Sequence, residues 1–232
     1  MVSSGLTNPQ GVAVDGQGNL YIADTGDNAI KEWSAGTLQT LSNAQNAPAA
    51  AAVDGHGNVY IADTGNHAIE VFNAANNPTL SSLVSGLSNP SGAAVDGQGN
   101  VYFSDTGNSV IDEWNAANGM ITPPSLSGLS NPTGVAVDAE GNVYFADSGQ
   151  NSIMKWNAVN GLSTLSGVSG LNNPTGVAVD GQDNVYIADT GNSAIKEWNA
   201  GNPTPLATLV STGLSRCLPH SPPAPNCWPR HR

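Results

Sequence analysis

Basic residues are scarce in this chain of 232 residues, which has 6 Lys and Arg against 18 Asp and Glu and a formal net charge of −12. All three arginines follow residue 215, so Lys31, Lys155 and Lys196 are the only Lys or Arg residues before it. Proteins bind nucleic acids largely through Lys and Arg side chains that displace counterions from the phosphates. The charge therefore argues against binding to nucleic acid or to an anionic membrane.

Long apolar runs are also missing, and cysteines are absent from most of the chain. No stretch of about 18 apolar residues is present, the length that a membrane-spanning helix requires. The N-terminal sequence MVSSGLTNPQG has no basic segment followed by an apolar one, so no signal peptide is visible. Both cysteines, Cys217 and Cys227, lie near the C-terminus and are compatible with any redox compartment. The cellular compartment stays open, and a secreted or cell-envelope parent protein is one option.

The sequence does contain a repeated motif. NVYIADTGN occurs at residues 58–66 and again at 184–192, and close variants occur at 19–27, 100–108 and 142–150. The aspartate that closes each AVD is a convenient anchor, and its positions are separated by 39, 42, 42 and 42 residues: Asp15, Asp54, Asp96, Asp138 and Asp180. A period of about 40 residues indicates a propeller or a solenoid.

Each copy reads as four short strands. GVAVD and NVYIAD are β-branched runs, and the Asp and Gly residues of DGQG between them suit a tight hairpin. A third run, AIKEW in the first copy, alternates, which places Ile30 and Glu32 on one face and Lys31 and Trp33 on the other. A fourth run follows, such as residues 37–41 or 205–210. Four antiparallel strands per copy make one propeller blade.

We therefore expect an all-β propeller of five four-stranded blades, at about residues 5–42, 43–86, 87–128, 129–170 and 171–211. The pattern NPxGVAVDxxGNVYIADTGNxxIxxW resembles the NHL repeat over about residues 5–211. The resemblance implies a β-propeller, usually with six blades, that serves mostly as a binding platform. A minority of the family are lyases, and lactonase-like enzymes are a related possibility.

The chain has five copies of the repeat, and its sequence changes at residue 216. Residues 216–232 contain five prolines and no alternation, so we expect an irregular Pro-rich tail. A sixth copy that was lost or replaced would explain this change. Two arrangements stay open: a closed ring of five blades, which we slightly favour, and five blades of a six-bladed geometry with a gap. A gap would expose the terminal blades and favour self-association.

The repeated aspartates are interpreted as structural. We expect those that end each NVYIAD run to accept hydrogen bonds from backbone N–H groups of the following turn: Asp24, Asp63, Asp105, Asp147 and Asp189. The AVD aspartates are assigned the same role in the first hairpin. DGQGN lacks the spacing and the terminal Glu of an EF-hand loop, so it does not predict a calcium site.

The sequence predicts no catalytic residue, metal site or cofactor. His56 and His67 fall in different turns of the second copy, and no G-x-S-x-G motif occurs. Asp112 and Glu113 are neighbours in one strand and point to opposite faces. An enzymatic function is therefore supported by the resemblance alone.

The residues that vary between copies are the candidate binding residues, because most are small, polar and capable of adaptable hydrogen bonding. They occupy the last position of the DTGN motif and the position after it: Asp27, Asn28, Asn66, His67, Asn108, Ser109, Asn151, Asn192 and Ser193. We expect a non-enzymatic binding or scaffold module that presents these loops to a protein, peptide or glycan. The alternatives are a propeller lyase or lactonase-like enzyme, and a fragment of a longer repeat protein without independent function.

Overall fold

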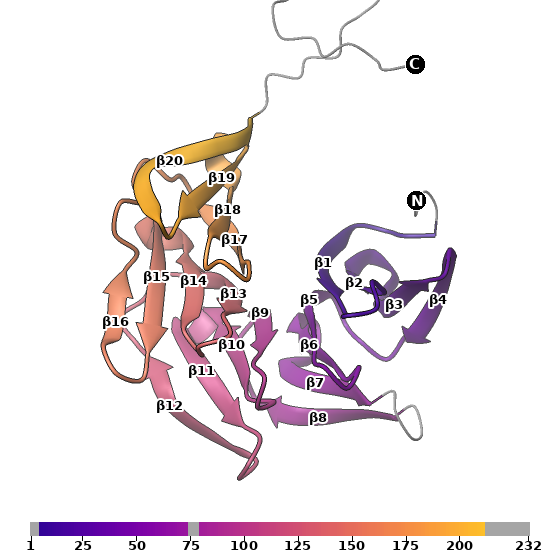
Figure 1. Cartoon of the computed structure of the whole chain (residues 1–232). Coiled ribbons are helices and arrows are strands. Elements are labelled where there is room, and N and C mark those ends of the chain that lie inside the picture. The colour runs from indigo at the N-terminus through magenta and orange to yellow at the C-terminus, as the bar shows by residue number, and fades with distance from the viewer. Residues whose placement is uncertain (1–4, 74–78, 212–232) are drawn as a thin grey trace, which may run out of the picture.

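The computed structural model describes residues 5–73 and 79–211, which form five antiparallel four-stranded sheets (Figure 1). The prediction of an all-β propeller with five four-stranded blades is confirmed. The predicted irregular tail and both cysteines lie outside the described residues. Among the described residues no helix is long and apolar enough to cross a membrane.

The blades follow one another along the chain, and the strands of each pair in sequence order. Blade 1 consists of β1 (Pro9–Val14), β2 (Leu20–Asp24), β3 (Ala29–Ser34) and β4 (Thr37–Ser42). Blade 2 consists of β5 (Pro48–Val53), β6 (Val59–Asp63), β7 (Ala68–Asn73) and β8 (Thr79–Ser85). Blade 3 consists of β9 (Pro90–Val95), β10 (Val101–Asp105), β11 (Val110–Asn115) and β12 (Met120–Leu126). Blade 4 consists of β13 (Pro132–Val137), β14 (Val143–Asp147), β15 (Ser152–Asn157) and β16 (Gly161–Thr164), and blade 5 of β17 (Pro174–Val179), β18 (Val185–Asp189), β19 (Ala194–Asn199) and β20 (Asn202–Ser211).

A three-residue 3-10 turn joins the second and third strands of every blade. These turns are η1 (Thr25–Asp27), η2 (Thr64–Asn66), η3 (Thr106–Asn108), η4 (Ser148–Gln150) and η5 (Thr190–Asn192). The residue after each turn has a left-handed backbone, with φ between 50° and 59°. The five DTGN-type motifs therefore adopt one conformation.

Apolar clusters hold successive blades together. Between blades 1 and 2, Ala23 and Ile30 pack against Val59, Ile61 and Phe72. Three further clusters of the same kind lie between blades 2 and 3, 3 and 4, and 4 and 5. Full burial of one such side chain stabilises a protein by about 1.5–3 kcal/mol. These interfaces are therefore a main source of stability, since each sheet alone leaves its faces uncovered.

A side-chain hydrogen bond accompanies each of these interfaces. The hydroxyl of the first residue of the 3-10 turn donates to the carbonyl of the proline that begins the next blade. The four oxygen–oxygen distances are 2.7, 2.7, 2.7 and 2.5 Å, for Thr25 to Pro48, Thr64 to Pro90, Thr106 to Pro132 and Ser148 to Pro174. We call these bonds the interblade hydroxyl bonds.

The ring is open between blades 5 and 1. The first strands of successive blades pack side by side from β1 to β17, but in the described part of the chain β17 has no comparable contact with β1. Figure 1 shows β17–β20 standing apart from β1–β4. The closed ring that the sequence slightly favoured is therefore wrong, and the structure has the other arrangement, five blades with a gap. The four existing interfaces repeat one packing, and five blades related in that way do not complete a circle.

Candidate functional site

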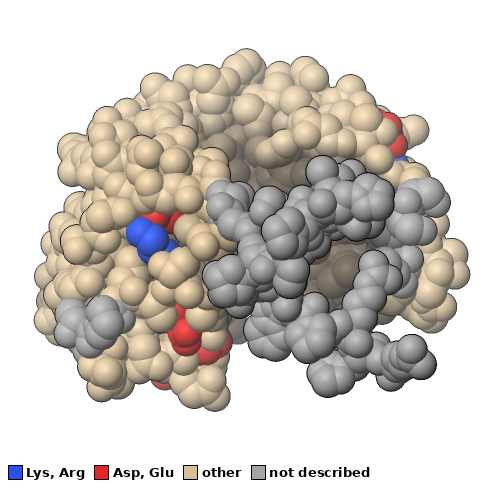
Figure 2. Space-filling model, turned by 90° about the horizontal axis from the view of Figure 1, so that it is seen from above, with Lys and Arg blue, Asp and Glu red and all other residues tan. Residues whose placement is uncertain are grey.

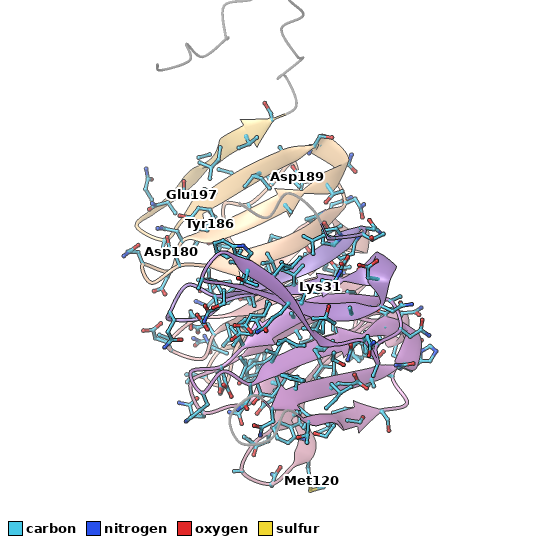
Figure 3. All side chains as sticks on the ribbon, turned by 90° about the vertical axis from the view of Figure 1, so that its right-hand side faces the viewer. Lys31, Met120, Asp180, Tyr186, Asp189 and Glu197 are labelled. Carbon is cyan, nitrogen blue, oxygen red and sulfur yellow. The ribbon has the colours of Figure 1, made fainter. Side chains whose placement is uncertain are left out.

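The two turns of a blade lie at opposite ends of its sheet. The Asp-Gly hairpin between the first and second strands marks one end, which we call the hairpin end. The 3-10 turn lies at the other end, beside the two residues that precede the first proline of the blade. We call those two residues the Asn-Pro loop, and this end the Asn-Pro end. In Figure 3, Asp180 and Tyr186 lie at one side of blade 5 and Asp189 at the other.

The aspartate at the end of each second strand binds the Asn-Pro loop. Asp24 accepts a hydrogen bond from the Thr7 backbone N–H at 2.7 Å, and the Gly26 N–H donates to the Thr7 carbonyl at 2.8 Å. The bond to the aspartate recurs in every blade, from Asn46 to Asp63, Ser88 to Asp105, Ser130 to Asp147 and Asn172 to Asp189. The sequence analysis placed the donor in the following turn, whereas this donor lies 17 residues earlier.

The glycine of the turn is needed for this close contact. A Cβ added at Gly26 would lie 2.5 Å from the Thr7 carbonyl oxygen. The aspartate and glycine of the DTGN motif thus fix the Asn-Pro loop against the 3-10 turn.

Two of these aspartates pair with a lysine from the third strand. Lys31 Nζ lies 2.5 Å from Asp24 Oδ2 and also pairs with Asp27, and Lys196 Nζ lies 2.6 Å from Asp189 Oδ2. Lys31 is buried. Burial disfavours the charged form of Asp189, but the hydrogen bonds from Lys196, Asn172 and Asn192 together outweigh burial and lower the pKa of Asp189. The ion pair with Lys196 thus helps to keep the Asp189 carboxylate charged.

Blade 2 has an acid at the position that Lys31 and Lys196 occupy. Burial raises the pKa of Glu70, and the nearby Asp63 carboxylate raises it further, although a hydrogen bond from Gln45 acts in the opposite direction. Gln45 is itself buried, and its Oε1 atom has no hydrogen-bond partner among the residues that the structure describes. This blade therefore holds two acids together without a lysine between them.

The hairpin aspartates form a local network at the other end. Asp54 Oδ1 accepts hydrogen bonds from the backbone N–H groups of His56 and Asn58, at 2.8 and 2.9 Å. Its Oδ2 accepts from the Asn58 side chain at 2.7 Å and from the Tyr60 hydroxyl at 3.1 Å. The same arrangement occurs at Asp15, Asp96, Asp138 and Asp180. Burial, together with the charge of Asp54, raises the pKa of Tyr60 to about 12.

Most of the predicted binding residues make hydrogen bonds within the propeller. Asn28 accepts from the Ala47 N–H at 2.8 Å, and Asn151 accepts from the Asn173 N–H at 2.7 Å, so both contact the next blade. The side-chain amides of three others donate to the turn aspartates of their own blades, each at 2.8 Å: Asn66, Asn108 and Asn192. Asp27 pairs with Lys31. His67, Ser109 and Ser193 occupy the left-handed positions after their turns.

The sequence analysis missed a second set of polar residues at the Asn-Pro end. The asparagine before the first proline of a blade is exposed and left-handed, with φ between 49° and 61°: Asn8, Asn89, Asn131 and Asn173. Ala47 takes this position in blade 2. Asn adopts positive φ more readily than most residues. The repeated Asn-Pro pair was the signal that could have identified this set.

The central channel is lined by small side chains. At one end, a cavity of about 480 Å³ is lined by Gly, Ala and Val residues together with Gln10, Ser91, Thr133 and Thr175. At the other end, a cavity of about 260 Å³ is lined by Ala and Val alone. The described lining therefore offers hydroxyl and amide groups, and no carboxylate, imidazole or amine.

Three carboxylates gather at the hairpin end between blades 4 and 5. Asp138, Glu140 and Asp183 each place an oxygen atom within 4.8 Å of the others. Asp183 has a φ of 63° where the four other blades have a glycine. The change from DGQGN to DGQDN was the sequence signal for this cluster. On the face seen in Figure 2, by contrast, most of the described surface is neither acidic nor basic.

Residues 6–33, 46–72 and 171–198 match the family model described as the NHL repeat. No curated protein sequence matches the chain. Among solved structures, a chain in the crystal structure of a nidogen/laminin complex is similar, with a TM-score of 0.76 and 22% identity over 87% of this chain and 80% of that one. A selenomethionine-substituted virginiamycin B lyase from Staphylococcus aureus has a TM-score of 0.69 and 15% identity, over 87% of this chain and 69% of the lyase. A streptogramin B lyase has a TM-score of 0.72 and 15% identity, over 91% and 71%.

These identities show similarity of fold alone. The NHL matches fall in blades 1, 2 and 5, and the other two blades have the same topology and the same turns. This chain is a five-bladed β-propeller in which blades 1, 2 and 5 match the NHL repeat.

Proposed function

We propose that the protein is a non-enzymatic binding module whose Asn-Pro end contacts a protein partner. The supporting observation is that every blade presents two left-handed residues at this end, one in the Asn-Pro loop and one after the 3-10 turn. Most of these residues are exposed, and their side chains are short and polar. Four blades carry a polar pair and blade 2 carries Ala47 with His67, which suits a partner that extends across several blades.

The backbone of this surface is held in place before any partner binds. The turn aspartates and the hydrogen bonds of Asn28 and Asn151 fix each loop to its own blade or to the next one. Within the described residues, the side chains of Asn89, Asn131 and His67 make no hydrogen bond. A fixed backbone with available polar side chains reduces the entropy lost on binding.

The structural neighbours support a binding function without identifying the partner. The nidogen/laminin structure contains a chain of similar fold within a protein complex, which favours a protein partner for this chain. The two lyases favour an enzyme, but the described channel lining lacks the titratable groups that usually serve as general acid or base. A glycan partner and lyase activity are therefore alternative outcomes of the experiment below.

The experiment uses arrays of immobilised extracellular protein fragments and of glycans. The full chain is compared with a variant that carries Asn89→Gly, Asn131→Gly and His67→Gly. Glycine adopts positive φ freely, so the backbone of the loops is expected to stay the same while the side chains are lost. The control variant carries Gln17→Ala and Gln98→Ala at the hairpin end.

We expect binding to one class of protein fragment, at least tenfold weaker binding by the triple-glycine variant, and no change in the control. Binding only to glycans would change the class of partner. Equal binding by all three proteins would contradict the assignment of the surface. No signal on either array would contradict the binding module itself.

A further inference from the structure

The gap in the ring exposes two apolar sheet faces. On blade 1, Val12 is 65% exposed and Val14 is 60% exposed. The residues equivalent to Val12 in blades 2, 3 and 4 are each 8% exposed: Ala51, Ala93 and Val135. Blade 1 therefore lacks the neighbour that covers this face of the following three blades.

Blade 5 lacks a neighbour on its opposite face. Ile195 is 38% exposed, whereas the four equivalent isoleucines are completely buried: Ile30, Ile69, Ile111 and Ile153. Ala178 is exposed as well, although the equivalent Ala52 and Ala94 are buried. The uncovered faces of blades 5 and 1 are thus the two complementary halves of one interblade interface.

Within residues 5–73 and 79–211, the interblade hydroxyl bond is missing at both faces. Among these residues the Thr190 hydroxyl contacts only Thr175 Oγ1, at 2.5 Å, and the Ala188 carbonyl, at 3.5 Å, both in its own blade. Pro9, which would accept such a bond from a preceding blade, is exposed, whereas the other four prolines at this position are buried: Pro48, Pro90, Pro132 and Pro174. A donor on blade 5 and an acceptor on blade 1 are therefore left without the partners that their counterparts have.

Blade 5 also has an empty cavity where a neighbouring blade would insert side chains. This cavity has a volume of about 320 Å³ and is lined by Ala188, Thr190, Ser193, Ala194, Ile195 and Val210. In blade 4, the equivalent Ala146 and Ile153 are covered by Val185 and Ile187 from the second strand of blade 5. The cavity therefore matches the second strand of a further blade.

The first strand of the missing neighbour must come equally close. A Cβ added at Gly134 of blade 4 would lie 2.7 Å from the Thr175 carbonyl of blade 5. At Gly176 of blade 5, the added Cβ would meet only Ala188 of the same blade, at 3.3 Å. No described backbone of a further blade therefore approaches Gly176. A small residue such as Gly or Ala at this position would permit such an approach.

We propose that the space between blades 5 and 1 is a docking socket for one further four-stranded NHL-type blade, carried by a second polypeptide. The two faces require one occupant that offers both halves of the interblade interface. A second copy of this chain does not fit, because each of its blades already has at least one face covered. Residues 216–232 contain no copy of the repeat. This inference is independent of the Asn-Pro end.

The test adds a single blade to the full chain in trans. The probe is a copy of residues 171–211 fused to a soluble carrier protein, and binding is followed by size-exclusion chromatography with light scattering. We expect a one-to-one complex. The blocked control carries Val12→Arg and Ile195→Arg, which alter two exposed side chains. It should fold with a similar melting temperature and should not bind the probe.

A second variant tests whether one added blade fills the socket. In this variant, a copy of residues 171–211 directly follows Ser211 and replaces residues 212–232. We expect its melting temperature to rise by at least about 5 °C, because several apolar side chains become buried. It should also no longer bind the probe in trans, since its socket is filled.

The proposal is overturned if the probe does not bind the full chain, whether or not the appended blade closes the ring. It is equally overturned if the blocked control binds as well as the full chain. If the full chain does not bind the probe but forms larger oligomers as its concentration rises, the two faces would be assigned to head-to-tail self-association. The socket-blocked variant should bind the arrays normally, which separates this test from that of the proposed function.

Discussion

The hydroxyl of Thr64 tests how successive blades are held together. Thr64 Oγ1 donates to the Pro90 carbonyl of the next blade at 2.7 Å, and Pro90 is buried. Thr64→Val keeps the shape of the side chain and removes the donor. A buried polar group left without its partner costs about 1–3 kcal/mol. Since 1 kcal/mol corresponds to about 2–4 °C in a domain of this size, the melting temperature should fall by about 2–12 °C.

Thr190→Val is the matched control, because the same motif in blade 5 faces the gap. Thr190 is exposed, and its hydroxyl reaches only groups of its own blade. Its free energy of unfolding should therefore change by less than about 0.5 kcal/mol, as for most surface substitutions. Urea unfolding followed by tryptophan fluorescence measures both variants. Equal losses would mean that Thr190 also bonds to a following blade, and two neutral variants would mean that these bonds do not stabilise the interfaces.

Three further substitutions have defined outcomes. Ile153→Ala should lower the free energy of unfolding by about 2–5 kcal/mol and Ile195→Ala by less than half as much, because one side chain is buried and the other is 38% exposed; similar losses in urea unfolding would contradict this. Asp183→Gly should raise the melting temperature in calorimetry, with a smaller gain in high salt, because glycine adopts the positive φ of this position without strain and the change removes a carboxylate beside two others; no gain at low salt would refute this. Burial, with Asp63 nearby, raises the pKa of Glu70. The folded state therefore holds the Glu70 proton more tightly than the unfolded state does. The stability that protonated Glu70 contributes is lost as the pH rises through its folded pKa. Glu70→Gln should therefore raise the melting temperature at pH 8 and leave it nearly unchanged at pH 4; an equal effect at both values would exclude this titration.

The blades were predictable from the sequence because the signals for the strands and turns of each blade lie within its own repeat. β-branched runs alternate with Asp-Gly and Thr-Gly turns, and these local signals do not depend on neighbouring blades. The open ring was not predictable in this way. Ile153 and Ile195 follow the same turn motif, and only the presence or absence of a following blade makes one buried and the other exposed. A repeated motif specifies the interface, but not whether a partner is present.

The Asn-Pro end was only partly predictable for a related reason. The DTGN motif identified the 3-10 turn, but not the pairing of its aspartate with a loop 17 residues earlier. Asn28 and Asn66 lie close together in their motifs, yet one bonds to the next blade and the other to its own aspartate. Such choices depend on distances between loops that are far apart in the sequence.

Chemical labelling of the exposed faces tests the central claim most directly. Val12→Cys and Val135→Cys are each made in a chain that carries Cys217→Ser and Cys227→Ser, and each is treated with a maleimide under native conditions. Val12 is 65% exposed and Val135 is 8% exposed. The open ring predicts that Cys at position 12 reacts nearly as fast as in the unfolded chain, while Cys at position 135 is protected until the protein unfolds. Equal protection at both positions would show that blade 1 is covered and would contradict the open ring.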